Sequence, residues 1–480
     1  MAFKIFNSAK RKKQEFFPIN FQKVGMYVCG VTVYDLCHIG HARSAIFFDV
    51  FVRFLRAEGY KVTYVRNFTD IDDKIINKAK ELGKSTSEIA KTYIRAFYED
   101  MGSLYVEKAD IEPRATEHIS EMIQMIQALI NNGHAYEADG DVFFSVESYR
   151  DYGRLSGRRL EDMKAGFRVE VDQKKRHPLD FALWKRAKEG EPYWESPWGR
   201  GRPGWHMECS VMSTKYLGKS FDIHGGGEDL LFPHHENERA QSICAQGGEF
   251  ARYWVHNGFV TMEGEKMSKS LGNFLTIRDA IKEYHPELLR LFLLSKHYRS
   301  PIDFRRDSVI ALQSALIRLY RMIERLERLW GKDKIKQIKE EKEESDSDLS
   351  RFLNYLKDDI NTAGAIGVLF DKVRALNRSI DRLEKEGDSG TEDMERGLSS
   401  IFQMADILGI LNEEPKEFFE RLHPELASLD MEKIERMIAE RADARAKKDF
   451  QKADAIRNEL RSMGIILEDS PRGTVWRLDV

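Results

Sequence analysis

The stretch "MYVCGVTVYDLCHIGHARS", residues 26–44, joins a strand to a helix and decides the fold of the N-terminal part of the chain. Residues 24–35 are rich in Val, Tyr and Thr, which is typical of a buried strand. Residues 41–60, "HARSAIFFDVFVRFLRAEGY", carry an apolar face and stop at Gly59, which predicts a helix. A second strand, "KVTYVRNFTD" at 61–70, follows. This strand–helix–strand unit predicts a parallel, doubly wound α/β sheet.

The composition is that of a globular protein with several domains. The 480 residues are 42% hydrophobic and 32% charged, and the net charge is only −3, so a nucleic-acid partner would have to be met by local basic patches. The four cysteines form no CxxC pair, which excludes a zinc ribbon and favours a reducing compartment. Without a secretory signal or a long apolar run, the expected setting is the cytoplasm, with no membrane contact.

The character of the sequence changes several times along the chain. Residues 85–135 have helical periodicity, whereas residues 136–200 are rich in Gly, Arg, Trp and Pro with only short strand-like pieces, which predicts an insertion into the sheet domain. After about residue 305 the pattern is almost wholly helical. Residues 331–348, "GKDKIKQIKEEKEESDSD", are charged and low in complexity, so we expect a solvated linker. Residues 425–480 predict two helices and a hairpin.

Two motifs are suited to binding a polyphosphate. "HIGH", residues 38–41, falls where the first strand passes into the first helix, the position at which open parallel sheets bind ligands, and a helix N-terminus favours anions. The alternative is that these are ordinary surface or hydrogen-bonding histidines. "EGEKMSKSLGN", residues 263–273, places Lys266 and Lys269 between Gly264 and Gly272, which is typical of a hinged loop that could neutralise phosphate charge. An exposed polar loop without a function is the alternative.

Together, "HIGH" and "KMSKS" resemble the paired signature of the class I aminoacyl-tRNA synthetases. The stretches "NFTDIDDKI", "GRPGWHMECSVM", "FDIHGGGEDLLFPHHENERAQS" and "GIILEDSPRGTVW" are similar to those of the cysteinyl-tRNA synthetases, and the likeness extends over essentially the whole chain. The resemblance implies a Rossmann-like catalytic domain with a connective insertion, then an α-helical bundle that binds tRNA and a small mixed C-terminal unit. The expected parts are a split catalytic domain at 1–135 and 201–260, the insertion at 136–200, the KMSKS loop and stem-contact region at 261–305, the helical bundle at 306–412 and an anticodon-recognising unit at 425–480.

The resemblance also implies a reaction in two steps. L-cysteine and ATP form cysteinyl-adenylate and pyrophosphate, and cysteine then passes to the 3′-terminal adenosine of tRNA(Cys). No side chain acts as a nucleophile, so His38, His41, Lys266 and Lys269 would act by positioning and charge stabilisation, with Mg²⁺ on the phosphates. The implied ATP-binding residues are His38, Gly40, His41, Gly226, Asp229, Lys266, Ser268 and Lys269. The cysteine pocket would contain Gly30, Thr69, Trp205 and His224.

Cys29 remains as a candidate metal ligand, although a cysteine on a buried strand is usually only a small apolar residue. In "FPHHENE" a helix after Pro233 would bring either His234 or His235 onto the same face as Glu238, and the spacing alone does not choose between them. The family pattern favours His234 and completes a one-zinc site with Cys29, Cys209 and Glu238. Because shape separates cysteine from serine by only about a hundredfold, a thiolate-preferring ion would give selectivity without editing.

A helix over residues 308–330 is a candidate tRNA contact. Its arginines recur at spacings of three and four, which predicts one basic stripe made of Arg318, Arg321, Arg325 and Arg328. The alternative is a solvated face in which they pair with Glu324 and Glu327.

Two other functions are compatible with parts of this pattern. A ligase that joins cysteine to a small amine would share the catalytic half but not the helical half and the C-terminal unit. An inactive homologue would be expected to lack signature lysines or metal ligands, and none is missing here. The expected protein is a monomeric enzyme that binds ATP, L-cysteine and tRNA(Cys).

Overall fold

The computed structural model describes residues 1–159, 173–267, 273–341, 346–386, 391–422, 431–470 and 473–478. Its centre is a four-stranded parallel sheet of β3 (Lys23–Thr32), β4 (Lys61–Thr69), β9 (Ser220–Gly227) and β10 (Phe250–Asn257), in the order β10-β9-β3-β4. The predicted parallel α/β sheet is therefore confirmed. Because β9 lies beside β3 although nearly 200 residues separate them in sequence, the C-terminal ends of these strands bring distant segments together.

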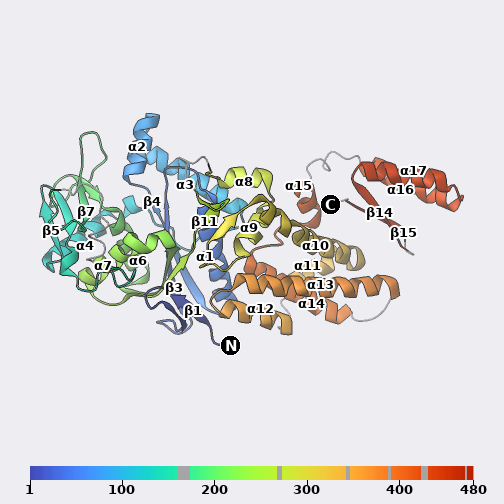
Figure 1. Ribbon diagram of the computed structural model, residues 1–480, viewed down its shortest axis with the longest axis horizontal. Coiled ribbons are helices and arrows are strands. Elements are labelled where there is room, and N and C mark those ends of the chain that lie inside the picture. The colour runs from blue at the N-terminus through green and yellow to red at the C-terminus, as the bar shows by residue number, and fades with distance from the viewer. Residues whose placement is uncertain are drawn as a thin grey trace. The chain divides into compact units, whose positions relative to one another are not determined.

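Helix α1 (Ile39–Ala57) makes the crossover from β3 to β4 and is apolar on more than one side. Phe48 faces Gly225 of β9, whereas α9 (Pro286–Leu294) and α14 (Thr391–Leu408) also pack on α1. A helix covered on both sides by protein is expected to be apolar all round, which explains the run of buried residues from Ile46 to Leu55. In Figure 1 α1 lies between the sheet and the helical half of the chain.

A long connection between β4 and β9 carries the insertion. The helices of this connection are α2 (Asp73–Leu82), α3 (Thr86–Ser103), α4 (Ile119–Asn131) and α6 (Trp205–Leu217), with short turns η1 (Ala115–Glu117) and η2 (Val146–Ser148). Its strands form a four-stranded antiparallel sheet of β5 (Ala135–Ala138), β6 (Asp141–Phe144), β7 (Phe181–Arg186) and β8 (Gly201–Pro203). This region is more regular than its composition predicts, since Val142, Phe144, Leu183 and Trp184 are buried in one core with α4 and α6.

Smaller elements complete the catalytic half. They are the hairpin β1 (Lys4–Asn7) and β2 (Lys12–Glu15), the turns η3 (Glu228–Leu230) and η4 (Leu231–His235), α7 (Glu236–Gln246), the small sheet β11 (Val260–Met262), β12 (Glu265–Lys266) and β13 (Ile302–Phe304), and helices α8 (Ile277–Glu283) and α9 (Pro286–Leu294). β12 and β11 form a hairpin that leads directly into the KMSKS loop.

The helical half consists of α10 (Arg306–Trp330), α11 (Lys332–Glu340), α12 (Ser347–Lys357), α13 (Thr362–Glu386) and α14 (Thr391–Leu408). Helices α12 to α14 lie side by side (Figure 1). The predicted linker at 331–348 is wrong in its first part, because α11 forms there. Ile335 and Ile338, three residues apart, bury one face of α11 against the bundle in spite of the surrounding charges.

The chain divides into two compact units, Met1–Asn412 and Glu413–Val480. The second unit has α15 (Pro415–Leu422), α16 (Met431–Ala446), α17 (Phe450–Ser462) and the hairpin β14 (Ile465–Ser470) and β15 (Gly473–Leu478). It has an apolar core of its own, made of Ile434, Met437, Ile456, Leu460, Ile465 and Leu467. Within the described residues, no helix is both long and apolar enough to cross a bilayer.

Candidate active site and metal centre

The "HIGH" tetrapeptide caps the N-terminus of α1 with its own side chains. His38 Nδ1 accepts a hydrogen bond from the Gly40 amide at 3.0 Å, and His41 Nδ1 accepts one from the His38 amide at 3.3 Å. Burial lowers the pKa of His41 to about 3, and the charges of His38 and Lys74 act in the same direction. A neutral His41 ring whose Nδ1 accepts must carry its hydrogen on Nε2. That N–H is therefore a donor for a ligand.

The segment after the KMSKS loop is docked on this turn. The Ile39 amide donates to the Leu275 carbonyl at 3.1 Å, and the Ile277 amide donates to the Cys37 carbonyl at 2.9 Å. The predicted loop residues Ser268 and Lys269 lie outside the described residues, and only the backbone of Lys266 is described. The structure thus brings the ends of the two signature motifs together.

A cavity of about 440 Å³ runs along the C-terminal ends of the strands. The predicted site residues in its lining are Cys29, Gly30, His38, Gly40, His41, Trp205 and Asp229. Of the remaining predicted pocket residues, Gly226, His224 and Thr69 are buried behind the lining. The Thr69 hydroxyl donates to Glu208 Oε2 at 2.6 Å, so a direct contact with substrate would require a rearrangement. Trp205, 39% exposed, forms part of the wall.

The four predicted metal ligands lie together, and one of them, Cys29, lines this cavity. Cys29 Sγ is 3.5 Å from Cys209 Sγ and 3.3 Å from Glu238 Oε1, and His234 Nε2 is 2.9 Å from the same oxygen. The donor atoms of all four lie within 4.8 Å of one another. β3 provides Cys29, α6 provides Cys209, and the helical turn from η4 into α7 provides the other two. His234 and Glu238 occupy one helical face, as their spacing of four predicts.

A β-bulge shapes the end of β3 at this point. Val28 pairs with Arg66 and Val31 pairs with Phe68, so Cys29 and Gly30 together face only Asn67 on β4. The Gly30 amide donates to Asn67 Oδ1 at 2.9 Å. A Cβ on Gly30 would lie 1.6 Å from the Asn67 carbonyl oxygen. Glycine is therefore required by the close approach of the two backbones beside Cys29.

The electrostatics of the cluster favour the ionised forms of Glu238 and Cys209 but not that of Cys29. Burial raises the pKa of Glu238, but the imidazoles of His234 and His224 outweigh burial and hold that pKa well below its usual range. Burial also acts to raise the pKa of Cys209, yet hydrogen bonding from Cys29 and His234 lowers it to about 6. Burial raises the pKa of Cys29 well above its ordinary value in the absence of a cation. A bound cation would lower the pKa of such a thiol.

The donor set fits a zinc ion. Zinc–sulfur bonds of about 2.3 Å and zinc–nitrogen or –oxygen bonds of about 2.0–2.2 Å give tetrahedral edges of roughly 3.3–3.8 Å. The contacts of Cys29 with Cys209 and Glu238 fall in this range, and the His234–Glu238 contact is slightly shorter. Two thiols, an imidazole and a carboxylate match the ligands that zinc prefers.

Three further histidines surround this set. His235 is the alternative to His234 that the spacing left open, whereas His206 and His256 were not predicted as site residues. His206 Nδ1 lies 2.7 Å from His234 Nδ1, so it orients the ring whose Nε2 faces Glu238. His235 Nδ1 lies 2.8 Å from His256 Nε2. Trp205 stacks on the His234 ring with a centroid distance of 4.1 Å. The only sequence signal for His206 is its position next to the predicted residue Trp205, which does not show what it contacts.

The predicted tRNA-binding arginines differ in their surroundings. Arg318 and Arg328 are exposed, and Arg321 is half-buried. Arg325 pairs with Asp381 at 2.6 Å and with Glu384 at 2.8 Å, both on α13. Its charge is therefore balanced by α13, which favours a role in helix packing for this one residue.

Comparison with known proteins places this site in a family. The model described as "tRNA synthetases class I (C) catalytic domain" matches residues 15–314. The chain is 50% identical over 481 residues to the cysteine–tRNA ligase of Maridesulfovibrio salexigens, covering 98% of this chain and 99% of the relative. It belongs to the cysteine–tRNA ligase family. Its reaction is accordingly the aminoacylation of tRNA with cysteine by a class I synthetase, as the sequence predicts.

Further similarities cover the rest of the chain. The cysteine–tRNA ligase of Pelobacter propionicus is 51% identical over 495 residues, covering both chains completely. The models "DALR domain" and "Cysteinyl-tRNA ligase anticodon binding domain" match residues 351–412 and 431–477. Mycobacterium tuberculosis methionyl-tRNA synthetase, solved with methionyl-adenylate, has a TM-score of 0.58 at 14% identity and covers 84% of this chain and 92% of its own. That likeness supports the shared fold.

Proposed function

We propose that this chain converts L-cysteine and ATP to cysteinyl-adenylate and transfers cysteine to the 3′-terminal adenosine of tRNA(Cys), with one zinc ion selecting cysteine over serine. The observation that carries this proposal is that Cys29 belongs both to the donor cluster and to the wall of the cavity that contains the "HIGH" turn. A thiol-selective centre and a phosphate-binding turn thus serve one cavity.

At the nucleotide end, the proposed ligands are N–H donors. The Nε2–H of His41 and the N-terminus of α1 suit phosphate oxygens, and Gly40 leaves the backbone accessible. A Cβ on Gly40 would lie 2.8 Å from the His38 ring, which supports the need for glycine there. Lys266, Ser268 and Lys269 would complete the phosphate site, Gly226 and Asp229 would contact the adenosine, and Mg²⁺ would accompany ATP.

At the amino-acid end, Cys29, Cys209, His234 and Glu238 would hold the zinc ion. When bound, zinc supplies a Lewis-acidic centre that prefers a thiolate to a hydroxyl. Gly30 and Trp205 would border the substrate, while His224 and Thr69 would act from behind the wall. His206 orients His234, so the ring presents Nε2 to the site.

The tRNA would be bound mainly by the helical parts of the chain. We assign the backbone contacts to Arg318, Arg321 and Arg328, with Arg325 holding α10 to α13. The proposed division into catalytic parts (1–135 and 201–260), insertion (136–200), KMSKS and stem-contact region (261–305), tRNA-binding bundle (306–412) and anticodon unit (425–480) follows the predicted boundaries. We also propose that the protein is a monomer that works in the cytoplasm.

The metal requirement is tested by measuring the zinc content of the purified protein and its recognition of cysteine. Protein purified without added zinc is expected to hold close to one tightly bound equivalent, and Cys209→Ser is expected to lose it. Because a serine hydroxyl is a poor zinc ligand, the KM for cysteine in pyrophosphate exchange should rise by about 100-fold or more, with a smaller change in the KM for ATP. Discrimination against serine should fall in parallel.

Cys244→Ser is the matched control, since Cys244 is also a buried thiol of the same region but does not belong to the donor cluster. It should keep the metal and the KM for cysteine. Metal-free wild-type protein that still prefers cysteine to serine would contradict the selectivity mechanism. Cysteine-dependent exchange without charging of a tRNA(Cys) transcript would instead indicate a small-amine ligase.

A further inference from the structure

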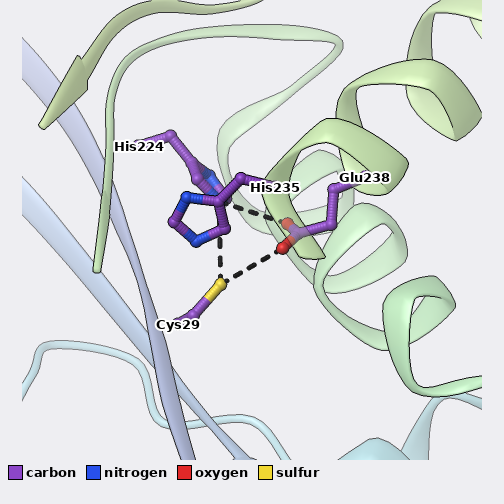
Figure 2. A group of neighbouring side chains, drawn as sticks. All are labelled: Cys29, His224, His235 and Glu238. Carbon is purple, nitrogen blue, oxygen red and sulfur yellow. Dashed lines mark hydrogen bonds and ion pairs between the residues drawn. The ribbon is translucent and has the colours of Figure 1, made fainter. Parts of the chain in front are cut away.

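A second set of possible metal ligands overlaps the first. Cys29, His224, His235 and Glu238 also place four donor atoms within 4.8 Å of one another, and they share Cys29 and Glu238 with the proposed zinc site. Figure 2 shows these side chains turned toward one another from β3, β9 and the start of α7. The three residues on β9 and α7 are fully buried.

Glu238 offers one oxygen to each set. Its Oε1 lies 2.9 Å from His234 Nε2, whereas its Oε2 lies 3.1 Å from His224 Nε2. Cys29 Sγ lies 3.5 Å from Cys209 Sγ on one side and 3.6 Å from His224 Nε2 on the other. The two Cys29 separations fall within the roughly 3.3–3.8 Å edges of a tetrahedral zinc site, and the two Glu238–histidine separations are slightly shorter. A carboxylate and a thiolate that face two sets of donors can bridge two ions.

Several donor atoms of the second set lack an ordinary partner. His235 Nε2 is buried and meets no hydrogen-bond partner within the part of the chain that the structure describes. Glu238 Oε2 is close to His224 Nε2 but outside the geometry of a hydrogen bond. Buried polar atoms without partners are costly, so the grouping of these donor atoms within 4.8 Å favours a cation between them.

The Nδ1 atom of His235 is held by a neighbouring side chain, as expected for a metal-binding imidazole. His235 Nδ1 lies 2.8 Å from His256 Nε2, and His256 Nδ1 lies 2.8 Å from the Ser8 hydroxyl. Metal-ligating histidines usually hold their second nitrogen in such a contact, which sets the tautomer and the ring orientation. The chain from Ser8 through His256 therefore leaves Nε2 of His235 as the free ligand atom.

We propose that Cys29, His224, His235 and Glu238 form a second, weaker site for zinc or a similar divalent transition-metal ion, next to the proposed zinc site and bridged to it by Cys29 and Glu238. The inference rests on the proposed function, because the two sites share ligands. Three anionic donors, Cys29, Cys209 and Glu238, would leave a buried negative charge with one divalent ion, and this charge favours a second cation.

The test is a cobalt titration of the full chain after removal of metal with a chelator, in the absence of cysteine. Bound Co²⁺ is counted by equilibrium dialysis, and visible absorption reports thiolate coordination. Wild-type protein is expected to bind two equivalents, the second more weakly. His235→Asn keeps a polar group near the Nδ1 position for His256 but lacks Nε2, so it should weaken the second equivalent by about 100-fold and leave the first unchanged.

Cys209→Ser separates this inference from the proposed function, because Cys209 belongs only to the first set. It should lose the tight equivalent and keep the weak one. One equivalent in wild-type protein that Cys209→Ser abolishes and His235→Asn leaves intact would overturn the second site alone. One equivalent that His235→Asn abolishes and Cys209→Ser leaves intact would overturn both proposals.

Discussion

Single side chains around the start of α1 determine how the nucleotide end of the site can work. His38 and His41 use their Nδ1 atoms to cap the helix, which leaves Nε2–H as the ligand-facing donor of the neutral His41 ring. Each histidine of the tetrapeptide can therefore cap the helix with one ring nitrogen and still offer the other to a ligand, because the two nitrogens of an imidazole are distinct.

The depressed pKa of His41 predicts acid sensitivity. An unfolded chain binds a proton at this ring below about pH 6.5, whereas the folded chain does so only near pH 3, so stability falls as the pH decreases through this window. Between pH 7 and pH 5 the loss from this group should be about 2 kcal/mol. Urea unfolding at both pH values should show that His41→Asn is less sensitive to acid by this amount. Equal pH dependence of the two proteins would contradict the assignment.

Replacing Gly30 is expected to disturb the packing of the β3 bulge beside Cys29. Gly30→Ala places a Cβ against the Asn67 carbonyl, so the bulge beside Cys29 must shift. We expect a loss of about 1–3 kcal/mol in the free energy of unfolding and a raised KM for cysteine. Gly102→Ala in helix α3, where a Cβ meets nothing within 4 Å, should leave the KM unchanged and should not lower the free energy of unfolding. A Gly30→Ala protein with unchanged metal content and KM would show that the bulge does not set the site.

Among the elements, buried polar contacts hold α1, α9 and the end of α14 together. The Arg290 guanidinium on α9 forms an ion pair with Asp49 on α1 and donates to the Leu408 carbonyl at 2.6 Å and the Leu104 carbonyl at 3.1 Å. One side chain thus ties the catalytic sheet's crossover helix to the helical half. Such a group stabilises the junction only while all its partners are present.

Replacing Arg290 therefore has a large expected cost. Arg290→Met leaves the buried Asp49 carboxylate with Arg53 as its remaining ion-pair partner and leaves two carbonyls without their donor. We expect a loss of about 3–5 kcal/mol in urea unfolding. Arg95→Met is the matched control, since Arg95 pairs with Glu99 on the surface of one helix, and its cost should stay below about 1 kcal/mol. Similar costs for the two changes would refute a special role for the junction.

The molecule as a whole contains two compact units, and the second unit has an apolar core of its own. Unit Met1–Asn412 contains the cavity and the donor cluster, and unit Glu413–Val480 has its own apolar core and matches the anticodon-binding model. Separate cores allow the first unit to fold without the second.

Truncation after Asn412 tests this division. The shortened chain should keep cysteine-dependent pyrophosphate exchange within about twofold, because every donor of the cavity and of the cluster remains. The kcat/KM for charging a tRNA(Cys) transcript should fall by at least about tenfold as contacts with the anticodon are lost. The exchange assay and the charging assay are run on the same preparation. Loss of both activities, with the fold retained by circular dichroism, would contradict the division.

The features of the fold and the site that could be predicted from the sequence are those that depend on local patterns. The strand–helix–strand unit and the pairing of His234 with Glu238 depend on spacings of a few residues, which follow from the periodicity of strands and helices. The α11 segment was mispredicted because its two buried isoleucines are outnumbered by charges in the sequence. Nor does spacing choose between His234 and His235, because both lie within reach of Glu238 along one helical turn.

The sequence by itself determined the parallel sheet, the two signature motifs and the family, since these rest on local periodicity and on motifs read in order. Only the tertiary structure decided which donors meet. Cys29 reaches Cys209, His224 and Glu238 because β9 pairs with β3 and the helical turn after β9 returns over the strand ends. That pairing joins residues about 200 positions apart, a relation that no local pattern contains. It also placed His234 in one set of donor atoms and His235 in the other, so the two histidines that spacing could not separate belong to two overlapping sets.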